Sequence, residues 1–288
     1  MRVLSVAALT GVAAAGAAAG APSGLIVFSS TSGTGGNSQV WAMSASGSGR
    51  HAITPASADA TMPAASPDGH RIAFVRRGEI YVMRSNGSQV RRLTRSGASE
   101  GAPAWSADSR WIAYSSESSG HSSIWKMRND GRRKTRLAVG LVGAPAWSPN
   151  GRRIAYAAHG RIWLMNANGR AKHALTHAPS GSGVDWAPAW SPDGRRVAYQ
   201  SNVGTGPREL TDEVWVVNAG GSHPVRLTRN ALNDSHPVWS PDGSWLLFES
   251  ERPNAAGGNH LWLMHPNGKG LHRAASWAGE QIWPSWAR

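Results

Sequence analysis

A short block recurs six times along this chain and constrains its fold more than any other feature. In most copies a proline is followed by a small residue, a tryptophan and a serine, and the copies begin at Pro63, Pro103, Pro145, Pro188, Pro237 and Pro284. Subtracting neighbouring proline numbers gives spacings of 40, 42, 43, 49 and 47 residues. A period of this length is typical of the four-stranded blades of a β-propeller.

Each block leads into the same succession of elements. The sequence Ser-Pro-Asp-Gly follows at 66–69, 191–194 and 240–243, and these residue types favour a tight turn. A second strand is then expected at 71–74, 111–114, 153–156, 196–199 and 245–248. A third strand is expected at 80–83, 124–127, 162–165, 214–217 and 261–264, and a basic strand closes the unit. The third strands are apolar at adjacent positions, which indicates a sheet covered on both faces, as in stacked blades.

The two ends of the chain determine the number of blades. Residues 25–28 and 40–43 match a second and a third strand, with no first strand before them, whereas 284–287 match a first strand with nothing after it. The C-terminal strand should therefore pair with the N-terminal blade and leave no free edge. The sequence predicts an all-β fold, a six-bladed β-propeller closed in this way.

The first residues have the pattern of a secretory signal peptide. Arg2 is followed by an apolar stretch rich in Ala, Gly and Val, and Ala19-Gly20-Ala21 fits the small-x-small rule for cleavage. Retention as a membrane anchor is the alternative. We expect a signal peptide at 1–21, a propeller at 22–288, and export to the periplasm, cell envelope or extracellular space. The chain has no cysteine, which excludes disulfides, thiol nucleophiles and cysteine-bound metal.

The repeat Pro-x-Trp-Ser-Pro-Asp-Gly, followed by strands such as Arg153-Ile-Ala-Tyr156, resembles that of the TolB-like β-propeller family. The resemblance covers residues 24–287 and implies a six-bladed propeller. It also implies a component of the cell envelope that contacts other proteins through its propeller. The family's name-giving protein has an additional α/β domain before the propeller, and the sequence from Pro22 onward leaves no room for one.

Acidic residues recur just ahead of the block, where the first strand of each blade would begin at one mouth of a central channel. They lie three or four residues before the proline and are absent only from the fourth blade: Asp59, Glu100, Asp185, Asp234 and Glu280. One interpretation is a carboxylate-lined mouth that binds a cation, a sugar or a basic peptide. The other is that each carboxylate binds backbone N–H groups of its own loop.

Three aromatic residues at the same mouth lie outside the repeat consensus. Trp186 stands beside Ala187-Pro188, Trp283 directly precedes Pro284, and His236 directly precedes Pro237. The tryptophans of the consensus are expected to pack between blades, whereas these extra rings suit contact with a ligand or a partner protein. We expect the acidic, tryptophan-bearing mouth to be the binding site, with an envelope protein or a cell-surface polymer as the partner.

Positive charge is expected elsewhere. The chain has 30 Lys and Arg against 17 Asp and Glu, a formal net charge of +13, and many arginines follow the turns or lie on outer strands. They would protect sheet edges or give peripheral contact with an anionic surface. Nucleic acid is not expected as a partner of an exported protein, and the chain is expected to be a monomer.

No local catalytic motif is present in the sequence. There is no Gly-x-Ser-x-Gly turn, His-Glu-x-x-His helix or Gly-x-x-x-x-Gly-Lys loop, and the 11 histidines are scattered over different repeats. No catalytic residue, metal or cofactor is therefore predicted. The alternative to a binding module is a glycan-processing enzyme, a hydrolase or lyase, that uses mouth carboxylates such as Asp185 and Asp234.

Overall fold

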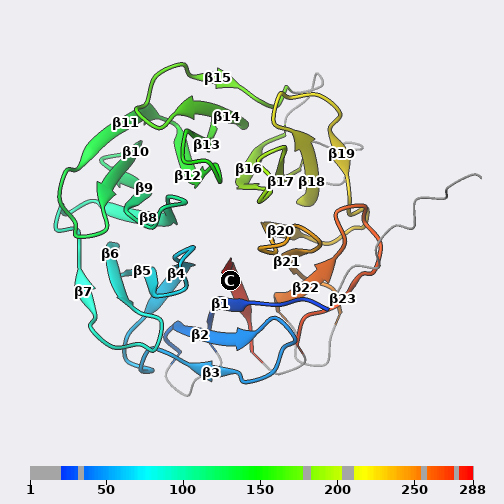
Figure 1. Cartoon of the computed structure of the whole chain (residues 1–288), viewed down its shortest axis with the longest axis horizontal. Coiled ribbons are helices and arrows are strands. Elements are labelled where there is room, and N and C mark those ends of the chain that lie inside the picture. Colours follow the sequence, from blue (N-terminus) through cyan, green and yellow to red (C-terminus); the bar gives the residue numbers. More distant parts are fainter. Residues whose placement is uncertain are drawn as a thin grey trace, which may run out of the picture.

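The computed structural model describes residues 21–31, 36–177, 183–202, 211–253, 258–275 and 279–287. Six four-stranded antiparallel sheets are arranged as blades in a ring (Figure 1), and no helix occurs among these residues. The expected six-bladed all-β propeller is confirmed. Residues 1–20, which contain nearly all of the predicted signal peptide, lie outside the described residues.

The strands of each blade are numbered from the channel outwards, except that the innermost strand of blade 1 is the last of the chain. Blade 1 consists of β24 (Gln281–Ala287), β1 (Leu25–Ser30), β2 (Gln39–Ser44) and β3 (His51–Ala52). Blade 2 consists of β4 (Ala60–Ala65), β5 (Arg71–Arg76), β6 (Glu79–Arg84) and β7 (Arg91–Arg92). Blade 3 consists of β8 (Ser99–Trp105), β9 (Trp111–Ser118), β10 (His121–Arg128) and β11 (Thr135–Gly140).

The other three blades follow the same order. Blade 4 consists of β12 (Val142–Trp147), β13 (Arg153–Ala158), β14 (Arg161–Asn166) and β15 (His173–Ala174). Blade 5 consists of β16 (Asp185–Trp190), β17 (Arg196–Ser201), β18 (Glu213–Asn218) and β19 (Val225–Arg226). Blade 6 consists of β20 (Asp234–Trp239), β21 (Leu246–Ser250), β22 (His260–Met264) and β23 (His272–Arg273).

The ring closes where the two ends of the chain meet. Strand β24 pairs with β1 in antiparallel register, from Leu25 opposite Ala287 to Ser30 opposite Gln281. Gly24 has a φ of 105°, and a Cβ there would lie 2.2 Å from the carbonyl oxygen of Ala287. This junction therefore requires glycine, both for its backbone conformation and for the close approach.

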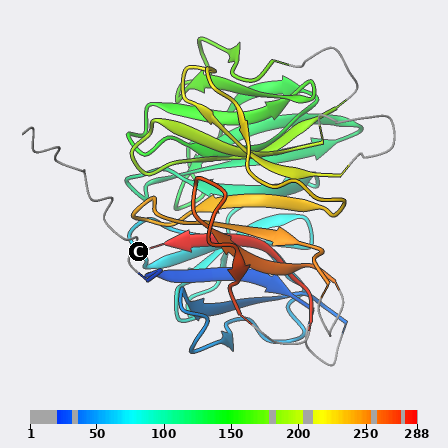
Figure 2. The same cartoon turned by 90° about the vertical axis from the view of Figure 1, so that its right-hand side faces the viewer.

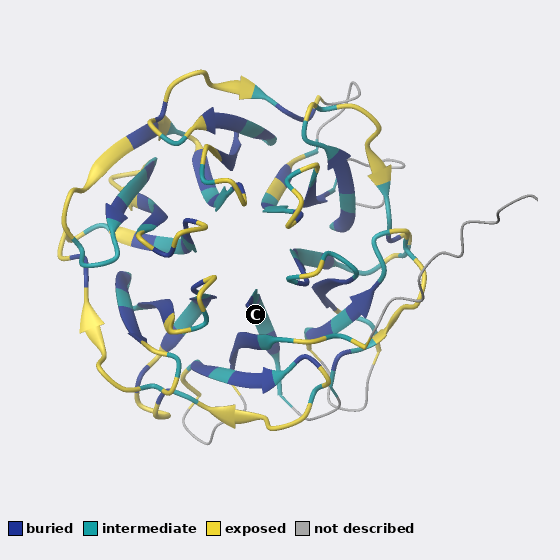
Figure 3. Ribbon diagram, viewed as in Figure 1, coloured by how far each residue is buried: buried dark blue, intermediate teal, exposed yellow. Residues whose placement is uncertain are grey.

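The core lies between the blades. Ile80 of blade 2 packs in one cluster with Ile112 and Met127 of blade 3, and all three are fully buried. Ile26 of blade 1 packs in the same way with Leu247 of blade 6. The second and third strands are thus covered on both faces, as their apolar sequence predicts, while the outer strands are exposed (Figure 3). Full burial of each such side chain contributes about 1.5–3 kcal/mol.

The strands run between the two faces of the ring (Figure 2). The face on which the first strand of each blade begins is called the acidic face below, and the opposite face is called the turn face. On the turn face, Ser66 Oγ donates to Asp68 Oδ1 at 2.5 Å, and Asp68 Oδ1 accepts from the backbone of His70 at 3.0 Å. The same contacts recur at Asp193 and Asp242, so the Ser-Pro-Asp-Gly block forms the predicted turn.

Candidate functional site

The central channel is lined by the first strands of the blades, as expected. Two cavities along it are bordered by residues that the structure describes. One of about 300 Å³ is bordered by the residues around the repeat prolines, and one of about 640 Å³ reaches the turn face. The larger cavity is walled by the consensus tryptophans Trp105, Trp147, Trp190, Trp239 and Trp286. Trp105 and Trp239 are 6% exposed, so these rings both pack between blades and border the channel.

A β-bulge interrupts every first strand at the repeat proline. The residue before each proline has a φ between 44° and 55°, in the left-handed region that non-glycine residues rarely adopt. All six of these residues border the smaller cavity: Met62, Ala102, Ala144, Ala187, His236 and Trp283. Three of them are alanines, in blades 3, 4 and 5, whereas Met62, His236 and Trp283 place larger side chains at the other three bulges.

His236 and Trp283 stack on each other across the junction between blades 6 and 1, with ring centroids 4.0 Å apart. Glu249 of β21 fixes both residues: its Oε1 accepts from the backbone N–H of Trp283 at 2.6 Å and lies 3.1 Å from His236 Nδ1. The backbone N–H of His236 donates to Gln200 Oε1 at 3.1 Å. Glu249 is 3% exposed. Sequence analysis missed it, although a glutamate in an otherwise apolar strand was the available signal.

The five predicted carboxylates do not form one ring. Glu100, Asp185 and Asp234 lie three residues before the proline, and their side chains are buried between strands and blades. Asp59 and Glu280 lie four residues before it, where Asp59 is exposed and Glu280 half-buried. Because successive side chains of a strand point to opposite faces, this single step separates the two groups. Only the second group is directed to solvent at the mouth.

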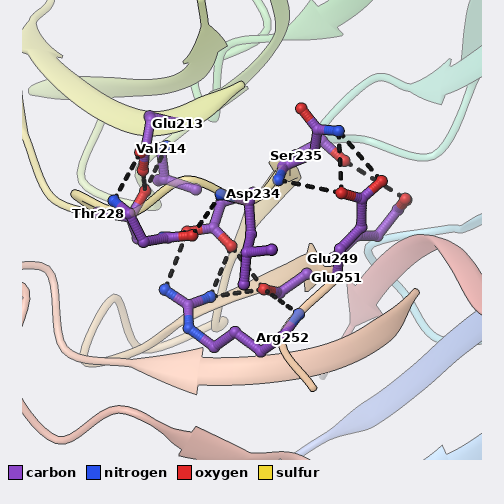
Figure 4. A network of polar contacts seen from close by, with 12 residues as sticks. Glu213, Val214, Thr228, Asp234, Ser235, Glu249, Glu251 and Arg252 are labelled. Atoms are coloured by element: carbon purple, nitrogen blue, oxygen red, sulfur yellow. Dashed lines mark hydrogen bonds and ion pairs between the residues drawn. The ribbon is translucent and has the colours of Figure 1, made fainter. Parts of the chain in front are cut away.

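Asp234 is fully buried and is neutralised by an arginine (Figure 4). Arg252 donates to it through both terminal nitrogens, with Nη1 2.5 Å from Oδ1 and Nη2 2.9 Å from Oδ2. Ser250 Oγ and Asn230 Nδ2 donate to the same carboxylate at 2.6 and 2.8 Å. Both carboxylate oxygens of Asp234 are therefore engaged within the protein.

Asp185 and Glu100 are also buried, but hydroxyl groups rather than an arginine side chain donate to their carboxylates. Thr176 Oγ1 and Ser201 Oγ donate to Asp185 at 2.5 and 2.6 Å, beside a cavity of about 190 Å³ between blades 4 and 5. Ser96 Oγ donates to Glu100 at 2.5 Å. Burial, which disfavours the charged form, raises the pKa of both carboxyls above their ordinary values.

This burial predicts the sign of a pH effect. A carboxyl whose pKa is higher in the folded chain binds protons more strongly there, so its contribution to stability declines as the pH rises above about 4, the unfolded value. The free energy of unfolding of Asp185→Asn, relative to the unsubstituted protein, is therefore expected to increase between pH 4 and pH 7. Urea unfolding at several pH values measures this difference.

Asp193 provides the matched control for that experiment. Ser191 Oγ donates to it at 2.5 Å and lowers its pKa, so its contribution to stability is present above the unfolded value of about 4 and is lost as the pH falls below it. The relative stability of Asp193→Asn should therefore decrease as the pH rises toward about 4 and change little between pH 4 and pH 7. Equal slopes for the two variants would contradict the assignment.

Exposed apolar side chains gather on the acidic face of blades 4 and 5. Trp186 is 38% exposed, and its ring covers Gly143, where a Cβ would lie 2.5 Å from the indole. Leu141 and Val184, at the residue before β12 and β16, are 69% and 48% exposed. Gly160 lies against Val184, and its neighbour His159 bonds to the carbonyl of Leu141, so these residues adjoin. Sequence analysis identified Trp186 but not the two aliphatic residues.

The enzymatic alternative requires two carboxylates that face one substrate. Among the described residues, neither Asp185 nor Asp234 lines either cavity of the channel, and Asp234 is engaged by Arg252. The described ranges contain no cluster of three metal-ligating side chains, and none of their segments is a helix of the length and hydropathy needed to cross a bilayer. The geometry gives no support to glycan chemistry at this pair.

Comparison with known proteins is consistent with the fold. Residues 60–256 match the family described as the Tricorn protease second beta propeller domain. The Tol-Pal system protein TolB of Desulfosudis oleivorans is 35% identical over 74 residues, which are 26% of this chain and only 16% of that protein.

Two solved structures are similar over most of this chain. TolB from Acinetobacter baumannii has a TM-score of 0.79 at 20% identity, covering 93% of this chain and 68% of that one. The putative TolB from Agrobacterium tumefaciens has a TM-score of 0.71 at 22% identity, covering 90% and 91%. At these identities the likeness establishes the fold.

Proposed function

Because the chain belongs to the family of the Tricorn protease second β-propeller domain and is a TolB-like propeller, we propose that it is a protein-binding module of the cell envelope. A propeller by itself does not specify a function, which depends on the surface it carries. The proposed surface is the acidic face, from Trp186 on blade 5 to the His236–Trp283 pair at the channel mouth.

The observation that carries this proposal is the aromatic pair. Blades 3, 4 and 5 have alanine at the bulge position, but in blades 6 and 1 His236 and Trp283 place two stacked rings beside the channel cavity. Their backbones are fixed by the buried side chains of Glu249 and Gln200, so the rings are held in place before a partner arrives. Pre-organised aromatic side chains at a pocket are typical anchors of protein interfaces.

The surroundings of the pair indicate the chemistry of the partner. Trp186, Leu141 and Val184 form an apolar patch, and such patches on a soluble protein mark interaction sites. Exposed carboxylates lie on the same face at Asp59 and Glu251. We propose a partner segment that presents apolar side chains flanked by Lys or Arg.

Export forms part of the same proposal. It rests on the predicted signal peptide at 1–21, since an envelope partner requires the propeller to leave the cytoplasm. Fractionation of cells that express the whole chain tests it: recovery in the cytoplasm at full length would contradict export, while a mature start near Pro22 would support it.

Trp186→Ala and Trp283→Ala are each expected to weaken partner binding by about 2 kcal/mol, roughly 30-fold in Kd, because buried tryptophans dominate interface energies. The measurement is a quantitative pull-down from the organism's own envelope fraction with the propeller as bait, followed by titration of the captured protein. Thermal unfolding of each variant verifies that the ring is intact.

Leu271→Ala is the matched control. Leu271 is 43% exposed, as Trp186 is 38% exposed, but it lies in the connection between β22 and β23 on the turn face. This variant should bind like the unsubstituted protein. Gly143→Ala provides a second variant. The added methyl group must shift the Trp186 indole from its position, although the tryptophan itself is kept. If both tryptophan variants bind like the Leu271 control, the acidic face is not the docking surface.

A further inference from the structure

A cleft of about 750 Å³ opens on the turn face between blades 2 and 3, away from the surface proposed above. The start of β5, the end of β6, the start of β7 and the turn after β10 border it; Figure 1 locates these strands. Its polar lining includes Arg71, Arg84, Arg91, Asn86, Gln89 and Asp130. The cleft is within the size range of small-molecule sites.

Two of its arginines face each other directly. Arg71 of β5 and Arg84 of β6 are partners in the antiparallel register, and side chains at such positions are close neighbours. Like charges placed directly opposite destabilise a sheet. Within the described part of the chain, neither guanidinium takes part in a hydrogen bond or ion pair that could offset this repulsion.

No other blade has this arrangement at the same position. The equivalent pairs in register are Leu25 with Ser44, Trp111 with Arg128, Arg153 with Asn166 and Arg196 with Asn218. In blade 6, Trp245 and His265 stack instead, with ring centroids 3.8 Å apart. In the other five blades this pair of facing residues contains at most one arginine, and only in blade 2 does it consist of two.

The cleft also lacks a matching negative charge among its described residues. Its one carboxylate, Asp130, accepts from the backbone of Arg132 at 2.9 Å and lies 4.0 Å from Arg128 Nε, so it serves its own turn. Arg91, on β7, adds a third guanidinium and donates to the carbonyl of Asn129 at 3.2 Å. Three arginines therefore border one hollow beside a single, engaged carboxylate.

We infer that this cleft binds an oxyanion, a phosphate or carboxylate group carried by a sugar. Two facing guanidinium groups can each donate two hydrogen bonds to such a group, and the anion removes their mutual repulsion. The space beyond one oxyanion is bordered by the neutral polar side chains Asn86 and Gln89, which suit hydroxyl groups. The ligand class is therefore an anionic sugar, such as a sugar phosphate or a uronic acid.

The experiment uses the whole chain in buffers of constant ionic strength, with inorganic phosphate, glucose 6-phosphate and galacturonate as separate probes. Isothermal titration gives the dissociation constants, and thermal unfolding gives the stabilisation. Loss of one charged hydrogen-bonding partner should weaken binding at least about tenfold in Arg84→Gln. The control Arg153→Gln makes the same charge change in the equivalent register pair of blade 4, where Arg153 stands at the position of Arg71 and faces Asn166, and it should bind like the unsubstituted protein.

A second readout does not depend on the identity of the ligand. Without any anion, Arg84→Gln should unfold at a higher temperature than the unsubstituted protein, because one of the two facing charges is gone, whereas Arg153→Gln should show no such gain. Added phosphate should raise the melting temperature of the unsubstituted protein and leave that of Arg84→Gln unchanged. Equal phosphate responses in all three proteins, or none in any, would overturn the inference.

Lipid headgroups carry the same phosphate chemistry, and a vesicle assay separates them. The propeller is sedimented with phosphatidylglycerol vesicles and with phosphatidylcholine vesicles as control. Binding of soluble sugar phosphate without vesicle binding supports the inference. Arg84-dependent sedimentation with phosphatidylglycerol in the absence of any response to soluble probes would assign the cleft to a membrane surface and overturn it.

Discussion

Deletion of residues 281–288 is expected to abolish the cooperative fold. This removes β24, which supplies the innermost strand of blade 1 and pairs with β1 along its length. It also removes Trp286, which packs on the cluster that contains Leu247 and Leu261 of blade 6. Blade 1 would keep an unpaired edge, and the ring would open beside it. Near-ultraviolet circular dichroism and size-exclusion chromatography should show loss of fixed aromatic packing and aggregation.

A circularly permuted chain shows whether stability depends on the pairing of β24 with β1 or on the position of β24 at the end of the chain. Ala287 lies opposite Leu25, so a short Asn-Gly-containing turn can join β24 to β1 directly. A chain that begins at 281, continues through this turn to Leu25 and ends at 280 retains every strand in its place. It should unfold cooperatively near the temperature of the natural order. If the truncated chain does so too, closure by β24 is not needed for stability.

Arg252→Leu is expected to destabilise the protein by about 3–5 kcal/mol, because it leaves a buried carboxylate without its cation. Arg252 is 15% exposed and Asp234 0%, and their contact is bidentate. Solvent cannot replace the lost partner at that depth. Urea unfolding at pH 7 measures the free energy, and Arg252→Leu combined with Asp234→Asn should recover part of the loss.

The exposed pair of Arg128 and Asp130 serves as control. Their closest atoms are 4.0 Å apart, and the side chains are 42% and 37% exposed. Arg128→Leu should change the free energy of unfolding by no more than about 0.5 kcal/mol. A comparable loss in both arginine variants would mean that burial of Asp234 is not the reason for the effect.

The fold could be predicted because every repeat contains the same pattern of turn and strand residues. The Ser-Pro-Asp-Gly turn, the apolar second and third strands and the split first blade point independently to the same ring, and the strands at 71–76 and 79–84 form where the pattern places them. Blade packing is local in sequence: Ile80 meets Ile112 of the next repeat. Such a pattern needs no information from distant parts of the chain, except at the closing strand.

The candidate site was predicted only in part. His236 and Trp283 departed from a consensus of small residues, and that departure was visible in the sequence. The carboxylates were grouped by their approximate distance from the proline, but a difference of one residue changes the side of a strand. Asp185 is therefore buried and Asp59 exposed, although each precedes the equivalent proline of its own repeat.

By itself, the sequence determined the number of blades, the closure and the channel-lining strands, because these follow from short-range patterns that recur. Only the tertiary structure decided which charges are compensated. Glu249 beneath Trp283, Arg252 on Asp234 and Arg71 opposite Arg84 are contacts between strands, and their meaning depends on register and burial. A charge is structural when a partner reaches it in the interior, and it remains available for a ligand when none does.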